Sequence, residues 1–183
     1  MLEDLKKIIT GLKYWNLRLK NPKVDENFQA RLIIQKLAFI CKSLGFQMKY
    51  SFNLYKSGPY CPSLTRDYYQ HSNHVINLES NYVPTKKEKE ILEKVKVDLL
   101  SHPLNDRHRA DLLEAVATIL FIKKYDSDDI FEKTKNEKPF LSDRIITIAI
   151  NIVKKLLFKP EFLTDEIKEE LEIWDNVDDF NSD

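Results

Sequence analysis

Apolar residues recur at helical spacing along most of the chain. In residues 2–20 they lie three and four positions apart, which predicts an amphipathic helix that Asn21-Pro22 ends. Asp25 is expected to cap a second helix that runs to Leu44 and stops at Gly45. The same spacing, with suitable capping residues before it, predicts further helices over residues 62–68, 85–100, 106–124, 145–157 and 164–174.

One segment has a different period. From Phe46 to Leu54 apolar and polar residues alternate, which is typical of a half-buried strand. We expect this strand, over residues 47–56, to pair with a short strand over 75–79. The pattern therefore predicts a mainly α, multi-helix single domain with a small winged-helix-like β-hairpin near residues 47–79.

The charges divide the chain into two parts. Its 183 residues contain 29 basic and 29 acidic side chains, so the formal net charge is zero. Residues 161–183 contain ten acidic residues and one lysine, a net of −9, which leaves +9 for residues 1–160. We expect a helical domain over 1–160, followed by an acidic C-terminal helix and frayed tail over 161–183. Three interpretations of that tail stay open: solvated surface, a cover over the basic body, or a binding site for a basic partner.

The sequence lacks the features of several protein classes. With two cysteines and three glycines it has no disulfide scaffold, no P-loop and no dinucleotide-binding motif, and we expect two free thiols, no cofactor and no metal. The most apolar stretch, Ile145 to Phe158, is too short to span a bilayer, and the N-terminus has no signal-peptide pattern. We therefore expect a cytoplasmic protein that does not bind membranes.

Two patterns suggest activity on nucleic acids. Arg66 and His71 are separated by four residues, a spacing similar to that of the Arg-x(4–6)-His motif of HEPN ribonucleases. There a histidine acts as acid or base and an arginine stabilises phosphorane charge. The first fifty residues also carry many basic side chains, which on a winged-helix unit would contact DNA phosphates: Lys6, Lys7, Lys13, Arg18, Lys20, Lys23, Arg31, Lys36, Lys42 and Lys49. Solvated helix faces explain the same lysines without any ligand.

A longer pattern resembles a prokaryotic family. Its first part runs from Arg31 through Gln35-Lys36-Leu37 to Gly45, and its second part is Tyr55-Lys-Ser-Gly58-Pro59-Tyr60. Leu113-Glu114-Ala-Val-Ala-Thr-Ile and Lys138-Pro139 extend the match. Over residues 28–157 the chain resembles the YwgA-like family of small proteins and, more remotely, the Panacea-type (SocA-like) antitoxins. Cys61, where that family has serine, and the acidic end are departures.

The resemblance implies a non-enzymatic regulator that binds a protein partner, either a toxin or a defence effector. The residues that carry it have structural or partner-binding roles, and none is an evident nucleophile or acid–base pair: Arg31, Gln35, Lys36, Tyr55, Gly58, Pro59, Tyr60 and Glu114. We expect Gly58-Pro59 to fix a tight turn across which Tyr55 and Tyr60 pack. Gln35 is expected to satisfy the turn carbonyls from below. A winged-helix DNA regulator and an Arg66/His71 ribonuclease stay as alternatives.

Overall fold

The computed structural model describes residues 2–22, 27–125, 129–158 and 164–175. Over these residues the protein is mainly helical and contains one two-stranded antiparallel sheet. The elements are α1 (Leu2–Tyr14), α2 (Phe28–Ser43), β1 (Asn53–Tyr55), β2 (Gly58–Tyr60), α3 (Pro62–Gln70), α4 (Ser72–Ile76), α5 (Lys86–Lys94), a π-helical segment η2 (Val95–Leu100), α6 (Leu104–Tyr125), α7 (Ile130–Glu137), α8 (Asp143–Leu157) and α9 (Asp165–Asp175).

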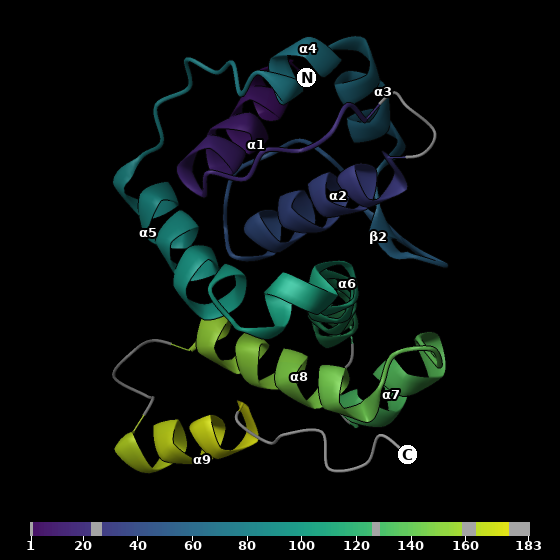
Figure 1. The fold of residues 1–183 in the computed structure, drawn as a ribbon, viewed down its shortest axis with the longest axis vertical. Helices are drawn as coiled ribbons and strands as arrows, with labels where there is room; N and C mark the ends of the chain where they lie inside the picture. The colour runs from purple at the N-terminus through teal and green to yellow at the C-terminus, as the bar shows by residue number, and fades with distance from the viewer. Residues whose placement is uncertain (1, 23–26, 126–128, 159–163, 176–183) are drawn as a thin grey trace.

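Helix α6 organises the core because it packs against α2, α8 and α7 and also contacts β2 (Figure 1). Leu112, Val116 and Ile119, which the apolar spacing predicts to face inward, are at most 1% exposed. Helix α1 packs beside α2 and α3, and α5 continues into η2, which contacts α8. Among the described helices, none has both the length and the apolar character needed to cross a membrane.

Local capping chemistry sets several helix starts, as the sequence predicts. The Thr85 hydroxyl accepts from the Glu88 amide at 3.3 Å, and the Glu88 carboxylate accepts from the Thr85 amide at 2.9 Å, which completes the capping box. Ser142 accepts from the amide of Ile145 at the start of α8. At α9 the Thr164 hydroxyl has the same role.

Helix α1 is shorter than predicted. It ends at Tyr14 rather than near residue 20, because Asn16 adopts a left-handed backbone conformation with φ 52°. The Trp15 indole then donates to the carbonyl of Leu92 at 2.9 Å, which ties the end of α1 to α5. The apolar spacing after Tyr14 therefore belongs to a loop that packs on the core.

The predicted hairpin is wrong in its second strand. β1 pairs with β2, in the register Asn53–Tyr60, Leu54–Pro59 and Tyr55–Gly58, whereas Val75 lies in α4. Gly58 has φ 77°, a left-handed conformation that glycine adopts without strain. It lets the chain reverse direction through the two residues between Tyr55 and Gly58. The partner of β1 is therefore the next segment of the chain and not the predicted strand over residues 75–79. The structure does not establish a winged-helix fold.

Residues 46–52, which precede β1 and which we call the extended segment, pair with no strand among the residues that the structure describes. Its apolar residues Phe46, Met48, Tyr50 and Phe52 are buried, and the polar residues between them are exposed, as the period-two pattern predicts. Lysine side chains take the place of a second strand: Lys7 Nζ donates to the Gln47 carbonyl at 2.6 Å, and Lys42 Nζ donates to the carbonyls of Met48 and Tyr50. These bonds satisfy backbone acceptors that a sheet would otherwise satisfy.

Candidate functional site

A buried cluster of charged side chains lies under the β1–β2 hairpin. Lys36 from α2 donates to the carbonyl of Pro59 at 2.9 Å. Lys138, directly after α7, forms an ion pair with Glu114 of α6 at 2.9 Å and donates to the carbonyls of Tyr55 and Lys56. The exposed fractions of Lys36, Lys138 and Glu114 are 2%, 1% and 5%. Both lysines therefore hold hairpin carbonyls, and the cluster fastens the hairpin to α2, α6 and α7.

Burial weakens the protonation of Lys36. Loss of solvent lowers the pKa of this ammonium to about 8; the negative charge of Glu114 opposes the shift, and the positive charge of Lys138 adds to it. Because Lys36 lies beneath the hairpin, its amine does not reach a ligand in solvent. Lys36 and Glu114, two of the residues on which the family resemblance depends, therefore support the hairpin from inside the protein.

Gly58 is needed where the hairpin approaches the cluster. A Cβ atom at this position would lie 3.0 Å from Thr118 Oγ1 and 3.3 Å from Lys36 Nζ, and its φ of 77° is unfavourable for any other residue. The glycine therefore lets the hairpin lie directly on the Lys36 amine.

Gln35 fixes the junction between β2 and α3. Its side-chain oxygen accepts from the Cys61 amide at 2.9 Å, and its side-chain nitrogen donates to the Cys61 carbonyl at 3.1 Å and to Thr65 Oγ1 at 2.9 Å. Thr65 in turn donates to Tyr60 Oη at 2.8 Å and accepts from Tyr68 Oη at 3.2 Å. Gln35, which we expected to satisfy turn carbonyls, bonds to Cys61 directly after β2, whereas Lys36 and Lys138 hold the carbonyls of the hairpin. The network orients Tyr60 of β2 and Tyr68 of α3.

Above this network lies a groove of about 260 Å³, which we call the aromatic groove. It is lined by residues from α2, the hairpin and α3: Phe28, Arg31, Leu32, Gln35, Ser57, Tyr60, Thr65, Tyr68 and Tyr69. Tyr68 and Tyr69 stack with ring centroids 5.3 Å apart, and Tyr55 packs edge-on against Tyr60 at 5.4 Å, as predicted. Three residues of the family-like motif, Arg31, Gln35 and Tyr60, therefore meet in one surface depression.

Two aromatic side chains at the edge of this region are open to solvent. Phe28 is 53% exposed and Tyr55 is 50% exposed. The guanidinium of Arg31 lies 5.8 Å from the centre of the Phe28 ring, and Arg31 also donates to the carbonyl of Pro22 at 3.2 Å. Phe28 and Tyr55, which we call the aromatic rim, are the accessible part of the site.

Arg66 lies on α3, and His71 directly follows this helix. Arg66 is exposed, and His71 caps the end of the helix and contacts the ring of His74 at 6.0 Å. Neither side chain lines the aromatic groove.

Several of the basic residues considered for DNA binding are engaged within the protein. Lys36 is buried, and Lys7 and Lys42 donate to backbone carbonyls of the extended segment. Lys23 lies outside the described residues. These bonds reduce the number of lysines that are available to contact phosphates.

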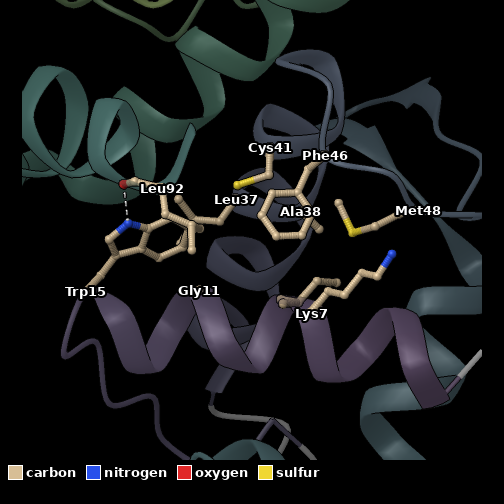
Figure 2. Close-up of a pocket in the computed structure, with 10 residues that line it drawn as sticks. Lys7, Gly11, Trp15, Leu37, Ala38, Cys41, Phe46, Met48 and Leu92 are labelled. Atoms are coloured by element: carbon tan, nitrogen blue, oxygen red, sulfur yellow. Dashed lines mark hydrogen bonds between the residues drawn. The ribbon is translucent and has the colours of Figure 1, made fainter. Parts of the chain in front are cut away.

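The cavity between α1, α2 and α5 is part of the core. Figure 2 shows its lining, in which Cys41 and Leu37 face Trp15 and Leu92, while the Lys7 amine extends toward Met48. Its volume of about 10 Å³ is at the lower limit for one water molecule, and its walls are apolar. Burial raises the pKa of the Cys41 thiol to about 12, so this sulfur is an inert core atom.

Both cysteines are free and buried. Within the described part of the chain, no group of three or more His, Cys, Asp or Glu side chains is placed to hold a metal ion.

The acidic helix lies away from the aromatic groove. Helix α9 packs on α8 at the opposite end of the molecule from α1 (Figure 1), and Leu171 is its buried anchor at 3% exposure. Within the described part of the tail, the acidic side chains therefore do not cover the hairpin. Residues 176–183 are outside the described residues.

Comparison of the chain with protein-family models, with curated proteins and with solved structures gives no match. The interpretation of the site therefore depends on its own geometry and chemistry.

Proposed function

We propose that this protein is a non-enzymatic regulator that binds a protein partner through the aromatic rim and the aromatic groove. The exposure of Phe28, whose ring lies beside Arg31, and of Tyr55, whose ring packs against Tyr60 of the groove, is the observation that carries this proposal. Aromatic residues and arginine are the residue types that most often dominate the binding energy of protein interfaces. The resemblance of the motif to YwgA-like proteins and Panacea-type antitoxins supports the same class of function. The regulator is then antitoxin-like, or an accessory protein of a prokaryotic toxin–antitoxin or defence system.

The rigid base of the hairpin supports a binding role. Lys36, Lys138 and Gln35 hold the hairpin and the start of α3 through backbone carbonyls and an amide, so Tyr55 of the aromatic rim projects from a fixed support. A preorganised surface loses less conformational entropy when a partner binds. Ser57 and Arg31, which both line the groove, add a polar and a basic group to it, which favours a partner segment that carries acidic as well as apolar side chains.

Co-expression with the product of the neighbouring gene in the native host tests this proposal. We expect a stable complex that survives size-exclusion chromatography and is lost in the Phe28→Ser/Tyr55→Ser double variant. Phe140→Ser is the matched control, because Phe140 is 62% exposed and lies between α7 and α8. A protein that retains no partner, or a complex that all variants retain equally, contradicts the proposal.

A winged-helix DNA regulator is the second candidate, favoured by the net charge of +9 on residues 1–160 and by a hairpin that packs on α2 and leads into α3. It requires DNA affinity that falls steeply as salt rises, and an affinity independent of salt would exclude it. The Arg66/His71 ribonuclease ranks lower, because these residues lie outside the aromatic groove. Equal RNA cleavage by the wild type and His71→Ala would exclude it.

A further inference from the structure

A second and larger groove lies at the other end of α2, which we call the basic groove. It has a volume of about 520 Å³ and shares no residue with the aromatic groove. Its lining comes from the last turns of α2, α6 and α8 and from the segment leading into β1: Phe39, Lys42, Ser43, Ser51, Phe52, Asn53, Leu120, Phe121, Lys123, Lys124 and Leu157. This volume lies in the range of small-molecule sites.

The polar part of the basic groove is cationic. Lys42, Lys123 and Lys124 line it, and no carboxylate is present among its described lining residues. Lys123 and Lys124 are exposed, whereas Lys42 is half-buried and holds the carbonyls of Met48 and Tyr50. Ser43, Ser51 and Asn53 are exposed at the same groove and offer neutral hydrogen-bonding groups.

Helix dipoles oppose an anion here, but they do not outweigh the lysines. Helices α2, α6 and α8 end at this groove, at Ser43, Tyr125 and Leu157. Each C-terminus carries a partial charge of about −0.5, so three of them contribute about −1.5. The three ammonium groups contribute +3, which leaves a positive local field. Neutralising the three helix C-termini therefore uses only part of the positive charge of the three lysines.

The remaining part of the basic groove is apolar and aromatic. The ring of Phe39 contacts Phe52 edge-on at 5.3 Å and Phe121 at 5.9 Å. Phe39 and Phe52 are buried, Phe121 is half-buried, and Leu157 is 38% exposed at the edge. A ligand that fills this groove has to present an anionic group to the lysines and a flat apolar group to Phe121 and Leu157.

We propose that the basic groove binds a nucleotide, with the phosphate at Lys123 and Lys124 and the base against Phe121 and Leu157. Phosphate satisfies several ammonium groups at once, and a base has an aromatic face that packs on phenylalanine. The same chemistry is offered by a free mononucleotide and by one unit of a single-stranded nucleic acid. This site is independent of the proposed partner-binding function.

Titration of the full chain with adenosine monophosphate, followed by calorimetry and amide chemical shifts, tests the proposal. We expect binding that weakens about tenfold or more in Lys123→Gln/Lys124→Gln. Ser51→Glu, which adds a negative charge at the exposed edge of the groove, is expected to weaken binding without removing a lysine. Lys13→Gln is the matched control, since Lys13 is an exposed lysine in the last turn of α1 and should leave binding unchanged.

Two further probes identify the source of the ligand. Inorganic phosphate is expected to bind at least tenfold more weakly than the nucleotide, and equal affinity would overturn the role of the apolar part. A short oligothymidylate that binds more tightly than the mononucleotide, with the same sensitivity to Lys123 and Lys124, would support the site and assign it to a nucleic-acid strand. Absence of binding by both nucleotide probes, or binding unaffected by the groove variants, would overturn the proposal.

Discussion

The ammonium of Lys138 lies 2.9 Å from the carboxylate of Glu114, and the two side chains are 1% and 6% exposed. Lys138 follows α7 and Glu114 lies in the middle of α6, so the pair joins two helices beneath the hairpin carbonyls of Tyr55 and Lys56. A charge at this depth is tolerated because each group has a partner of opposite charge or a carbonyl. The hairpin therefore depends on a residue more than eighty positions away in the chain.

Neutralising Glu114 should destabilise the protein strongly. In Glu114→Gln the Lys138 ammonium stays buried without its counter-charge, and the typical cost of breaking a buried pair in this way is about 3 kcal/mol. Urea unfolding at neutral pH measures this free energy. Asp165→Asn, which removes an exposed ion pair with Lys168, is the control and should leave the unfolding midpoint unchanged. Equal effects of the two substitutions would show that the buried cluster does not support the fold.

The buried ammonium of Lys36 should give stability a characteristic pH dependence. Its pKa is lowered to about 8 in the folded protein from 10.5, so between these values the unfolded chain binds more protons than the folded one. The contribution of Lys36 to the free energy of unfolding therefore rises with pH in this window, by on the order of 1 to 2 kcal/mol between pH 7.5 and 9.5. Below the folded pKa this contribution is constant, because both states hold the proton.

Comparison of the wild type with Lys36→Met isolates this effect. The rise in unfolding free energy between pH 7.5 and 9.5 should be smaller in the variant, because it lacks the Lys36 ammonium. Groups such as Tyr82, whose pKa burial raises to about 12, are present in both proteins, so their effect cancels in the comparison. Identical pH profiles would mean that the Lys36 amine is not desolvated in solution.

Gly58 should tolerate a methyl group less well than Gly45 does. Both glycines have positive φ, 77° and 107°, so alanine at either position adds backbone strain. Only at Gly58 does the new Cβ meet Thr118 Oγ1 at 3.0 Å; at Gly45 the nearest atom is 3.7 Å away. We expect Gly58→Ala to cost about 1 kcal/mol or more beyond Gly45→Ala, through steric overlap with the lysine cluster. Thermal unfolding measured by circular dichroism decides this, and equal losses would mean that the hairpin moves away from Lys36 easily.

Lys42 lies in the last turn of α2, where a lysine side chain is often only solvated, but here we expect it to stabilise the fold. Lys42→Met leaves the carbonyls of Met48 and Tyr50 without their donor, and an unsatisfied buried acceptor costs about 1–3 kcal/mol. Lys49→Met, whose side chain is exposed in the same segment, is the control and should change stability by less than about 0.5 kcal/mol. If chemical denaturation finds both variants equally stable, the lysine does not hold the extended segment.

Local chemistry explains which features the sequence could predict. The starts of α5 and α8 depend on Thr85 and Ser142, whose partners lie three residues away, so these two capping predictions are confirmed. Asp25, which was expected to cap the second helix, lies outside the described residues, and α2 begins after Asn27. The alternating burial of Phe46 to Phe52 also follows from sequence, because it reflects one exposed and one buried face. The partner strand of β1 was predicted wrongly, because the alternating pattern specifies no partner and the chain reverses at once to form β2. Lysine side chains satisfy carbonyls of the segment before β1.

Long-range contacts account for what sequence reasoning missed at the candidate site. Lys138 precedes a proline after a short helix, and no spacing in the sequence relates it to Glu114 or to the hairpin. Thr65 and Tyr68 join the Gln35 network only because α3 folds back over α2. The sequence also does not predict that Phe28 is exposed, because its helical spacing with other apolar residues is typical of a core position.

Binding of a protein partner by the aromatic rim can be measured as a dissociation constant. We would determine it by calorimetry for a partner identified by co-expression, with wild type, Phe28→Ser/Tyr55→Ser and Phe140→Ser. We expect at least a tenfold weaker complex for the double variant, which corresponds to about 1.4 kcal/mol, and wild-type affinity for Phe140→Ser. Equal dissociation constants for all three proteins would show that the rim does not bind the partner.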